Sequence, residues 1–168
     1  MASSVACGRQ RKRRSVAVAE KVTLDANILI YAFDESEPEK QPIAEQLLWL
    51  AQERRALLTT NALGEFFWAA TRKGKVAPLK ARRIVNDLIT MFGVIGYGPD
   101  HLDAAMLAVA GGRFSFWDAV MLAAAEEAGC TICFSEDMKD GARMDDIVVR
   151  NPFGAKGLSA AAAAALAP

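Results

Sequence analysis

Short apolar runs and longer stretches of helical periodicity alternate along the chain from about residue 21 to residue 150. The apolar runs predict strands over 21–24, 56–59, 94–97, 131–135 and 147–149. Apolar residues recur every three or four positions between these runs, which predicts helices over 26–33, 42–54, 61–73, 78–92, 100–110 and 116–128. Because strands alternate with helices, we expect an α/β fold in three layers, α/β/α, with a central and mainly parallel sheet.

Several residues mark where the predicted helices begin and end. Pro42 and Pro78 fall in first helical turns, where the missing backbone N–H is tolerated. Asn61 is the predicted N-cap of the helix that follows the second strand. Gly74 and Gly93 stand where two of the helices are expected to end.

The two ends of the chain lack this pattern. The charge run from Arg9 to Arg14 would repel itself in a helix, so we expect residues 1–20 to form a disordered basic arm. Six consecutive alanines over 160–165 have little surface to bury, so we expect residues 155–168 to form an Ala-rich tail. The predicted folded domain covers residues 21–154.

The composition agrees with one globular domain. The chain has 168 residues, of which 52% are hydrophobic and 24% are charged. No apolar run approaches the roughly 20 residues that cross a bilayer, and no long apolar segment follows the basic N-terminus. We therefore expect a cytoplasmic protein that does not enter the membrane.

The cysteines do not form the pattern of a disulfide framework, because three of them, Cys7, Cys130 and Cys133, leave an odd thiol. A reducing cytoplasm fits this count. The Cys130-x-x-Cys133 spacing is also found in zinc sites, but such a site needs about four ligands and His101 is the only histidine. Packing in the core is the favoured role for both cysteines.

The charge is unevenly distributed although the net charge is zero. Residues 1–21 hold six basic residues and one acidic residue, which leaves 14 basic and 19 acidic residues, a net charge of −5, from residue 22 onward. The folded part thus has no overall attraction for nucleic acid. Affinity for RNA would have to come from local basic patches, bound cations or the arm.

Four acidic residues occupy positions where an α/β sheet collects its functional groups. Asp25 follows the first strand directly, and Asp137 lies just beyond the strand at 131–135. Glu65 and Asp118 lie in the first turns of two helices. Carboxyl ends of parallel strands, and the helix starts beside them, face one crevice, so we expect these four carboxylates to converge.

Each of these acids also has a purely structural explanation. Asp25 could cap a helix, and Ser115 to Asp118 resembles a capping box. The negative charge of Glu65 could stabilise the N-terminus of its helix, and Asp137 could lie in a solvated turn. Four carboxylates together would repel one another unless a divalent cation neutralised them, and oxygen ligands without a histidine or thiolate cluster suit Mg²⁺, with Mn²⁺ as the alternative.

The segments around these acids resemble four motifs of the PIN-domain ribonucleases, particularly the VapC-like toxins of type II toxin–antitoxin pairs. The segments are 22–30 with Asp25, 61–66 with Glu65, 116–119 with Asp118 and 135–138 with Asp137, followed by Asn151-Pro152-Phe153. Their order and intervals agree with the family over about residues 22–153. The arm of residues 1–20 and the Ala-rich end have no counterpart in this resemblance.

The resemblance implies a metal-dependent endoribonuclease that hydrolyses RNA phosphodiester bonds. By resemblance, Asp25, Glu65, Asp118 and Asp137 are catalytic metal ligands, and Asn27 and Ser135 support them. It also implies a homodimer and an antitoxin protein that neutralises the toxin by inserting a segment near the metal site. Trp49 and Trp68 lie off the apolar stripes of their helices, so we expect both to be exposed and to be candidate anchors for a partner surface.

Basic residues at the end of the Glu65 helix, just beyond it and on the next helix are candidates for binding the RNA backbone. Their positions are equally well explained as those of ordinary solvated surface residues. They are Arg72, Lys73, Lys75, Arg82 and Arg83.

Two other classes of protein share parts of this pattern. A haloacid-dehalogenase-like phosphatase also has a strand that ends in Asp, but it would require a second Asp where this chain has Asn27. A PIN fold retained as a non-catalytic RNA-binding or protein-interaction module is the remaining alternative. The presence of all four acids favours the enzyme.

Overall fold

The computed structural model describes residues 20–72 and 76–167. The first half contains β1 (Val22–Leu24), α1 (Ala26–Ala32), α2 (Gln41–Glu53), β2 (Leu57–Thr59), α3 (Thr60–Arg72), α4 (Pro78–Met91) and β3 (Gly93–Ile95). The second half contains α5 (Pro99–Ala110), α6 (Phe116–Glu127), β4 (Ile132–Phe134), β5 (Arg143–Met144), β6 (Ile147–Arg150), β7 (Phe153–Gly154), β8 (Gly157–Leu158) and α7 (Ala160–Ala165).

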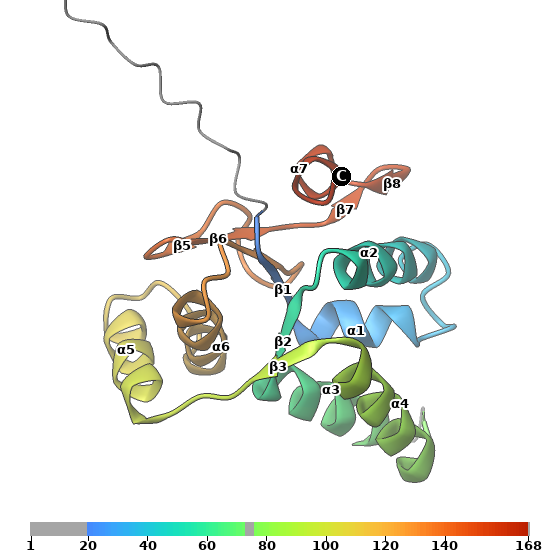
Figure 1. Ribbon diagram of the computed structural model, residues 1–168, viewed down its shortest axis with the longest axis horizontal. Coiled ribbons are helices and arrows are strands. Elements are labelled where there is room, and N and C mark those ends of the chain that lie inside the picture. Colours follow the sequence, from blue (N-terminus) through green and yellow to red (C-terminus); the bar gives the residue numbers. More distant parts are fainter. Residues whose placement is uncertain (1–19, 73–75, 168) are drawn as a thin grey trace, which may run out of the picture.

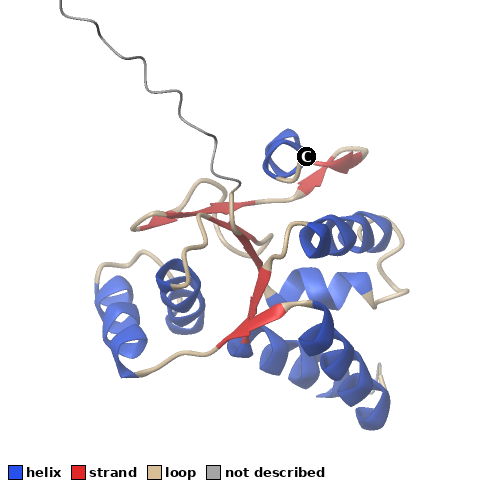
Figure 2. Ribbon diagram, viewed as in Figure 1, coloured by secondary structure: helices blue, strands red, loops and turns tan. Residues whose placement is uncertain are grey.

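The central sheet has the strand order β3-β2-β1-β4-β6-β5. Its neighbouring strands pair in parallel except β5, which pairs antiparallel with β6 at one edge. In Figures 1 and 2 the sheet separates α5 and α6 on one side from α1 to α4 on the other. The expected three-layer fold with a mainly parallel sheet is confirmed, while the short strand β5 was not predicted.

Alternation of side chains along the strands divides the core between the two faces. Leu24 and Phe134 belong to the cluster that packs with α1 to α4. Cys133 and Val149 belong to the cluster that packs with α5 and α6. The inner strands β1 and β4 are buried on both faces, which explains why they are continuous apolar runs in the sequence.

The connections place the reversal point of the strand order between β1 and β4. From β1 the chain proceeds outward through β2 to β3, and it then returns by way of α5 and α6 to β4 on the other side of β1. The strand order therefore reverses between β1 and β4. In open α/β sheets this reversal point, at the carboxyl ends of the strands, is where ligands bind.

One predicted helix boundary is wrong and another is confirmed. Thr59, not Asn61, caps α3, because the Thr59 hydroxyl accepts a hydrogen bond from the backbone N–H of Ala62 at 3.1 Å. α4 ends directly before Gly93 as predicted: Phe92 is its C-cap, and Gly93 already pairs with Leu57 in β3. Gly74 lies outside the described residues.

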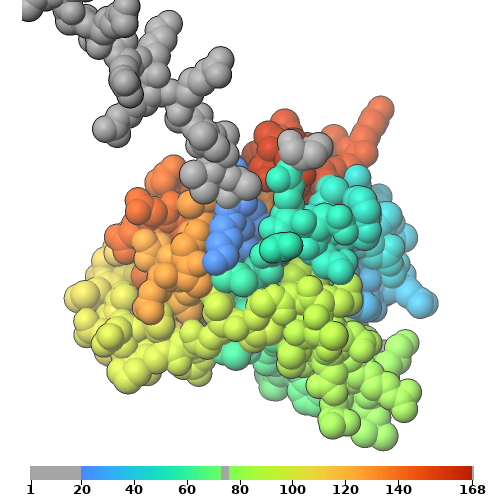
Figure 3. All heavy atoms as spheres, viewed as in Figure 1, coloured from blue at the N-terminus to red at the C-terminus, as the bar shows by residue number. Residues whose placement is uncertain are grey.

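The prediction of an Ala-rich tail is also wrong for most of its length. Residues 153–158 form the β7-β8 pair, and Ser159 caps α7 by accepting a hydrogen bond from the N–H of Ala162 at 3.2 Å. Ala162 and Leu166 are buried in the cluster shared with α1 and α2. In Figure 3 this C-terminal segment lies beside α2. Small alanine side chains allow a close approach, so the run packs against the domain. Of the predicted basic arm, residues 1–19 lie outside the described part.

The structure also bears on the cysteines, the single histidine and the expected absence of a membrane span. Cys130 and Cys133 are free and buried, which confirms their packing role. His101 accepts a hydrogen bond from the N–H of Gly98 at 2.8 Å and lies 2.8 Å from Glu127, so it joins α5 to the end of α6. Within residues 20–72 and 76–167, no helix is long and apolar enough to cross a membrane.

Candidate active site

Asp25 lies at the reversal point of the sheet and is only 6% exposed. Its backbone N–H donates to the carbonyl of Phe134 at 3.0 Å, which joins the end of β1 to the end of β4. Its Oδ1 accepts a hydrogen bond from the N–H of Ala26 at 2.6 Å and caps α1. The capping role considered from the sequence is therefore confirmed, and it fixes this carboxylate at the end of β1.

Ser135 and Asn27 hold the other oxygen of Asp25. The Ser135 hydroxyl donates to Asp25 Oδ2 at 2.6 Å, and Asn27 Nδ2 donates to the same atom at 2.8 Å. Asn27 Nδ2 also lies 3.1 Å from Ser135 Oγ. Ser135 Oγ in turn accepts hydrogen bonds from the backbone N–H groups of Asp137 and Met138, at 3.2 and 3.3 Å. One serine thus links the carboxylate after β1 to the loop after β4.

The four acids influence one another electrostatically. Burial raises the pKa of Asp25 from 3.8 to about 6; the hydrogen bonds from Ser135 and Ala26 oppose this rise, and the charges of Asp118 and Glu65 add to it. Partial burial likewise raises the pKa of Glu65, with contributions from Asp118 and Asp137. Asp118 and Asp137 also line one hollow of about 320 Å³.

The carboxylates at this site are ligands that suit a hard divalent cation, although they are not arranged as a complete coordination shell. Within residues 20–72 and 76–167, no three Asp, Glu, His or Cys side chains are arranged to hold an ion. The converging groups are carboxylates, which suit Mg²⁺ or Mn²⁺. Asn27 Oδ1 is buried and has no hydrogen-bond partner among the described residues, so it offers an acceptor for an ion's water ligand beside Asp25. Burial raises the pKa of Asp25 and Glu65 most and the neighbouring acids raise it further, and a cation there would favour the ionised forms of both.

Two cations that the sequence analysis did not select share a hollow with two of the acids. Arg113 and Lys139 line the hollow that contains Asp118 and Asp137. Their proximity in sequence to these two acids, five residues before Asp118 and two after Asp137, was the available signal.

Three of the cations selected from the sequence lie within the described residues, and none of the three lines this hollow. The guanidinium of Arg72 stacks 4.5 Å from the ring of Trp68, and Arg82 and Arg83 are exposed on α4. Lys73 and Lys75 lie outside the described residues.

An ion pair that the sequence did not indicate supports the loop after β4. Lys40 Nζ lies 2.7 Å from Glu136 Oε2, 3.2 Å from the hydroxyl of Tyr31 and 4.4 Å from the centre of the Tyr31 ring. Glu136 stands between Ser135 and Asp137. The segment before α2 therefore helps to fix the loop that carries two of the predicted site residues.

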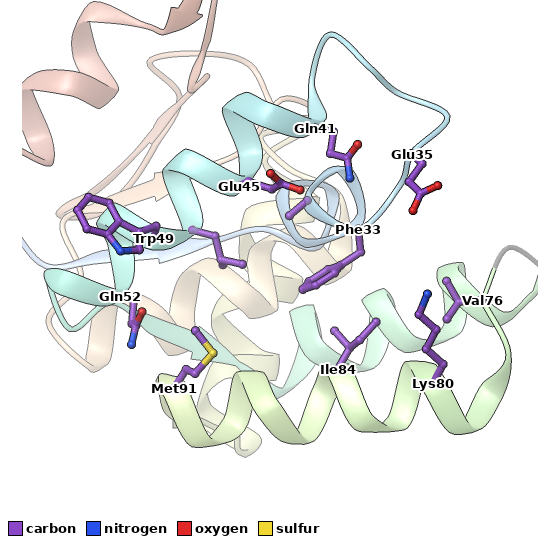
Figure 4. Close-up of a pocket in the computed structure, with 12 residues that line it drawn as sticks. Phe33, Glu35, Gln41, Glu45, Trp49, Gln52, Val76, Lys80, Ile84 and Met91 are labelled. Atoms are coloured by element: carbon purple, nitrogen blue, oxygen red, sulfur yellow. The ribbon is translucent and has the colours of Figure 1, made fainter.

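A separate hollow of about 330 Å³ lies between α2 and α4 and is shown in Figure 4. Its lining includes Phe33, Trp49, Ile84 and Met91 but none of the four acids of the crevice. Trp49 is 60% exposed and Trp68 is 56% exposed, so the exposure predicted for both tryptophans is confirmed.

The chain belongs to the PIN domain family, whose family model matches residues 22–144. This range contains all four acids, together with Asn27 and Ser135. No curated protein matches the chain significantly in sequence.

Solved structures of similar fold come from several bacteria. A sarcin–ricin-loop-cleaving toxin, VapC20 of Mycobacterium tuberculosis, has a TM-score of 0.57 and 17% identity, covering 70% of this chain and 92% of the other. A DNA-bound VapBC complex from Salmonella typhimurium has a TM-score of 0.56 and 18% identity, covering 78% and 97%. A toxin–antitoxin complex from Klebsiella pneumoniae has a TM-score of 0.56 and 20% identity, covering 79% and 98%. At these identities the likeness concerns the fold.

Proposed function

We propose that this protein is a metal-dependent endoribonuclease in which Asp25, Glu65, Asp118 and Asp137 bind Mg²⁺ or Mn²⁺. The observation that carries the proposal is the buried Asp25 carboxylate, whose pKa is about 6 although three hydrogen bonds hold it in place. A protein rarely keeps such a carboxylate beside other acids without using it. Membership of the PIN domain family agrees with this chemistry.

When bound, a divalent cation would polarise the scissile phosphate and lower the pKa of a bound water molecule. The chain's own residues hold and orient the groups around it. Ser135 and Asn27 keep Asp25 Oδ2 fixed, so this carboxylate requires little rearrangement. Arg113 and Lys139 provide positive charge beside Asp118 and Asp137, where RNA phosphates would otherwise be repelled. Arg72, Arg82 and Arg83 are proposed as more distant backbone contacts, as are Lys73 and Lys75.

The decisive test is cleavage of a mixed RNA pool by the purified chain with Mg²⁺ or Mn²⁺ and with EDTA. We expect cleavage only with metal, and we expect Asp118→Asn to lower its rate on the order of 100-fold or more. Asp87→Asn is the matched control, because Asp87 is exposed on α4. Full activity of Asp118→Asn would refute the assignment.

The same assay separates the enzyme from a non-catalytic module. A wild-type chain that binds RNA with either metal but cleaves none of the pool would be the binding module considered as the alternative. Unchanged circular dichroism and melting temperature of Asp118→Asn are required in either case. They show that a loss of cleavage arises from the missing carboxylate rather than from unfolding.

We further propose that the protein is the toxin of a toxin–antitoxin pair and forms a homodimer. The solved complexes of similar fold are described as VapBC or toxin–antitoxin assemblies. Met106, Leu107 and Val109 are large apolar side chains exposed on α5, a surface that suits a second copy. We expect sedimentation of a dimer at micromolar concentration and of a monomer for Leu107→Glu. A monomeric wild-type chain would exclude the dimer.

The antitoxin is proposed to inhibit through the acids themselves. An arginine on an inserted segment would pair with the carboxylates and compete with the cations. Addition of the protein encoded beside this chain should therefore abolish cleavage, and higher Mn²⁺ concentrations should restore part of it. Cleavage that is unchanged by a bound antitoxin would exclude this mode of inhibition.

A further inference from the structure

An aromatic hollow of about 500 Å³ lies against Glu65, where α3, the segment after β3 and the start of α6 meet. Trp68, Tyr97 and Trp117 line it together with Asn61 and Glu65. The exposed fractions of the three aromatic residues are 56%, 42% and 49%. The metal chemistry proposed above uses none of these rings.

The hollow is held in shape by contacts between its walls. The Tyr97 and Trp117 rings lie 6.2 Å apart at 63°, and Phe116 packs against Trp117 at 5.0 Å and 69°. Asn61 Nδ2 donates to the carbonyl of Trp117 at 3.5 Å, which joins the start of α3 to the start of α6. Edge-to-face contacts of this kind favour a defined ring orientation, so Trp117 is prepared for a ligand before one binds.

The lining matches the chemistry of a nucleobase. An aromatic ring offers a face for stacking, while the Asn61 amide and the Glu65 carboxylate offer groups for the polar edge of a base. A purely apolar ligand would leave these polar groups unpaired. The guanidinium of Arg72, 4.5 Å from the Trp68 ring, adds positive charge for the attached backbone.

Glu65 connects this hollow to the acidic crevice, because it lines the hollow and also interacts with Asp118 and Asp137. We propose that the hollow binds one unpaired base of a single-stranded RNA, next to the phosphate that lies at the carboxylates. This inference rests on the ribonuclease function proposed above. Bases in a duplex have their faces covered by neighbours, so the site would select single-stranded segments.

A binding experiment tests the inference without depending on cleavage. The quenching of tryptophan fluorescence is titrated with a uridine heptamer and with a heptamer of abasic ribose phosphates, with Ca²⁺ replacing Mg²⁺. We expect the wild-type chain to bind the uridine heptamer on the order of 10-fold more tightly. Trp117→Leu should lose this preference, whereas Trp117→Phe, which keeps a ring, should retain most of it. Trp49→Leu is the matched control, because Trp49 lines the separate hollow of Figure 4.

Two results would overturn the inference. One is equal binding of the two heptamers by the wild-type chain, and the other is an unchanged preference in Trp117→Leu. If a preference is absent and Trp117→Leu converts a dimer into a monomer, the hollow belongs to a contact between copies. If the wild-type chain binds the uridine heptamer more tightly than the abasic one but cleaves no RNA, only the proposed ribonuclease function is refuted. If it cleaves RNA but binds the two heptamers equally, only the base-binding inference is refuted.

Discussion

The buried carboxylate of Asp25 should make the ion-free protein less stable at neutral pH than in mild acid. Its pKa is about 6 in the folded protein and 3.8 ordinarily, so the folded state binds more protons between these values. The stability that this raised pKa contributes to the folded state is fully present below about pH 3.8 and is lost as the pH rises through 6. Because one pKa unit corresponds to about 1.4 kcal/mol, the full loss amounts to about 3 kcal/mol.

The perturbation that isolates this effect is Asp25→Asn, which keeps the shape of the side chain and removes its titration. Unfolding in urea is measured in EDTA at several pH values from 4 to 8 for the wild-type chain and the variant. The variant loses the hydrogen bonds that Asn27 and Ser135 donate to the replaced oxygen, which lowers its stability by a similar amount at every pH. The wild type loses stability as the pH rises from 4 to 8, whereas the variant lacks this loss. The difference in free energy of unfolding, variant minus wild type, should therefore rise by about 2 to 3 kcal/mol over this range.

Two further measurements make this prediction specific. The exposed Asp87→Asn control should show a difference from wild type that is nearly independent of pH. Added Mg²⁺ or Mn²⁺ at pH 7 should raise the stability of the wild type more than that of Asp25→Asn, because the ion binds the folded state. A pH-independent difference between Asp25→Asn and wild type would refute the claim that Asp25 is destabilised by burial in the folded protein.

Three other predictions follow from single contacts. Leu166→Ala should lower the free energy of unfolding by about 2 to 3 kcal/mol in urea melts, because Leu166 is buried; a loss below about 0.5 kcal/mol would mean that the C-terminal helix does not pack. Lys40→Met should lower stability by at most about 1 kcal/mol but speed amide hydrogen exchange at Asp137 and Met138, whose N–H groups donate to Ser135, and unchanged exchange would contradict its support of that loop. Arg113→Ala should raise the KM for RNA several-fold at constant kcat; a larger effect of Arg82→Ala would instead place the RNA backbone along α4.

The sequence by itself determined the layers of the fold and the positions of the four acids. Helix and strand periods are local properties, so the order of elements from β1 to β6, apart from the short edge strand β5, could be read from the spacing of apolar residues. A parallel sheet with helices on both faces then follows from that alternation, as does the edge at which Asp25 and Asp137 lie. The boundary at Thr59 was missed because two neighbouring residues, Thr59 and Asn61, are both good caps, and only the hydrogen bond to Ala62 distinguishes them.

Only the tertiary structure decided which distant residues meet at the site. Ser135 binds Asp25 across 110 positions in sequence, and Lys40 binds Glu136 across 96. These pairs form because β4 lies beside β1 in the sheet. The local spacing of apolar residues does not specify which strands become neighbours. The C-terminal helix is the clearest case, because six alanines carry almost no pattern of their own. Their role appears only when Leu166 reaches the core beside α2, since burial is a property of the surface that a segment meets rather than of the segment itself.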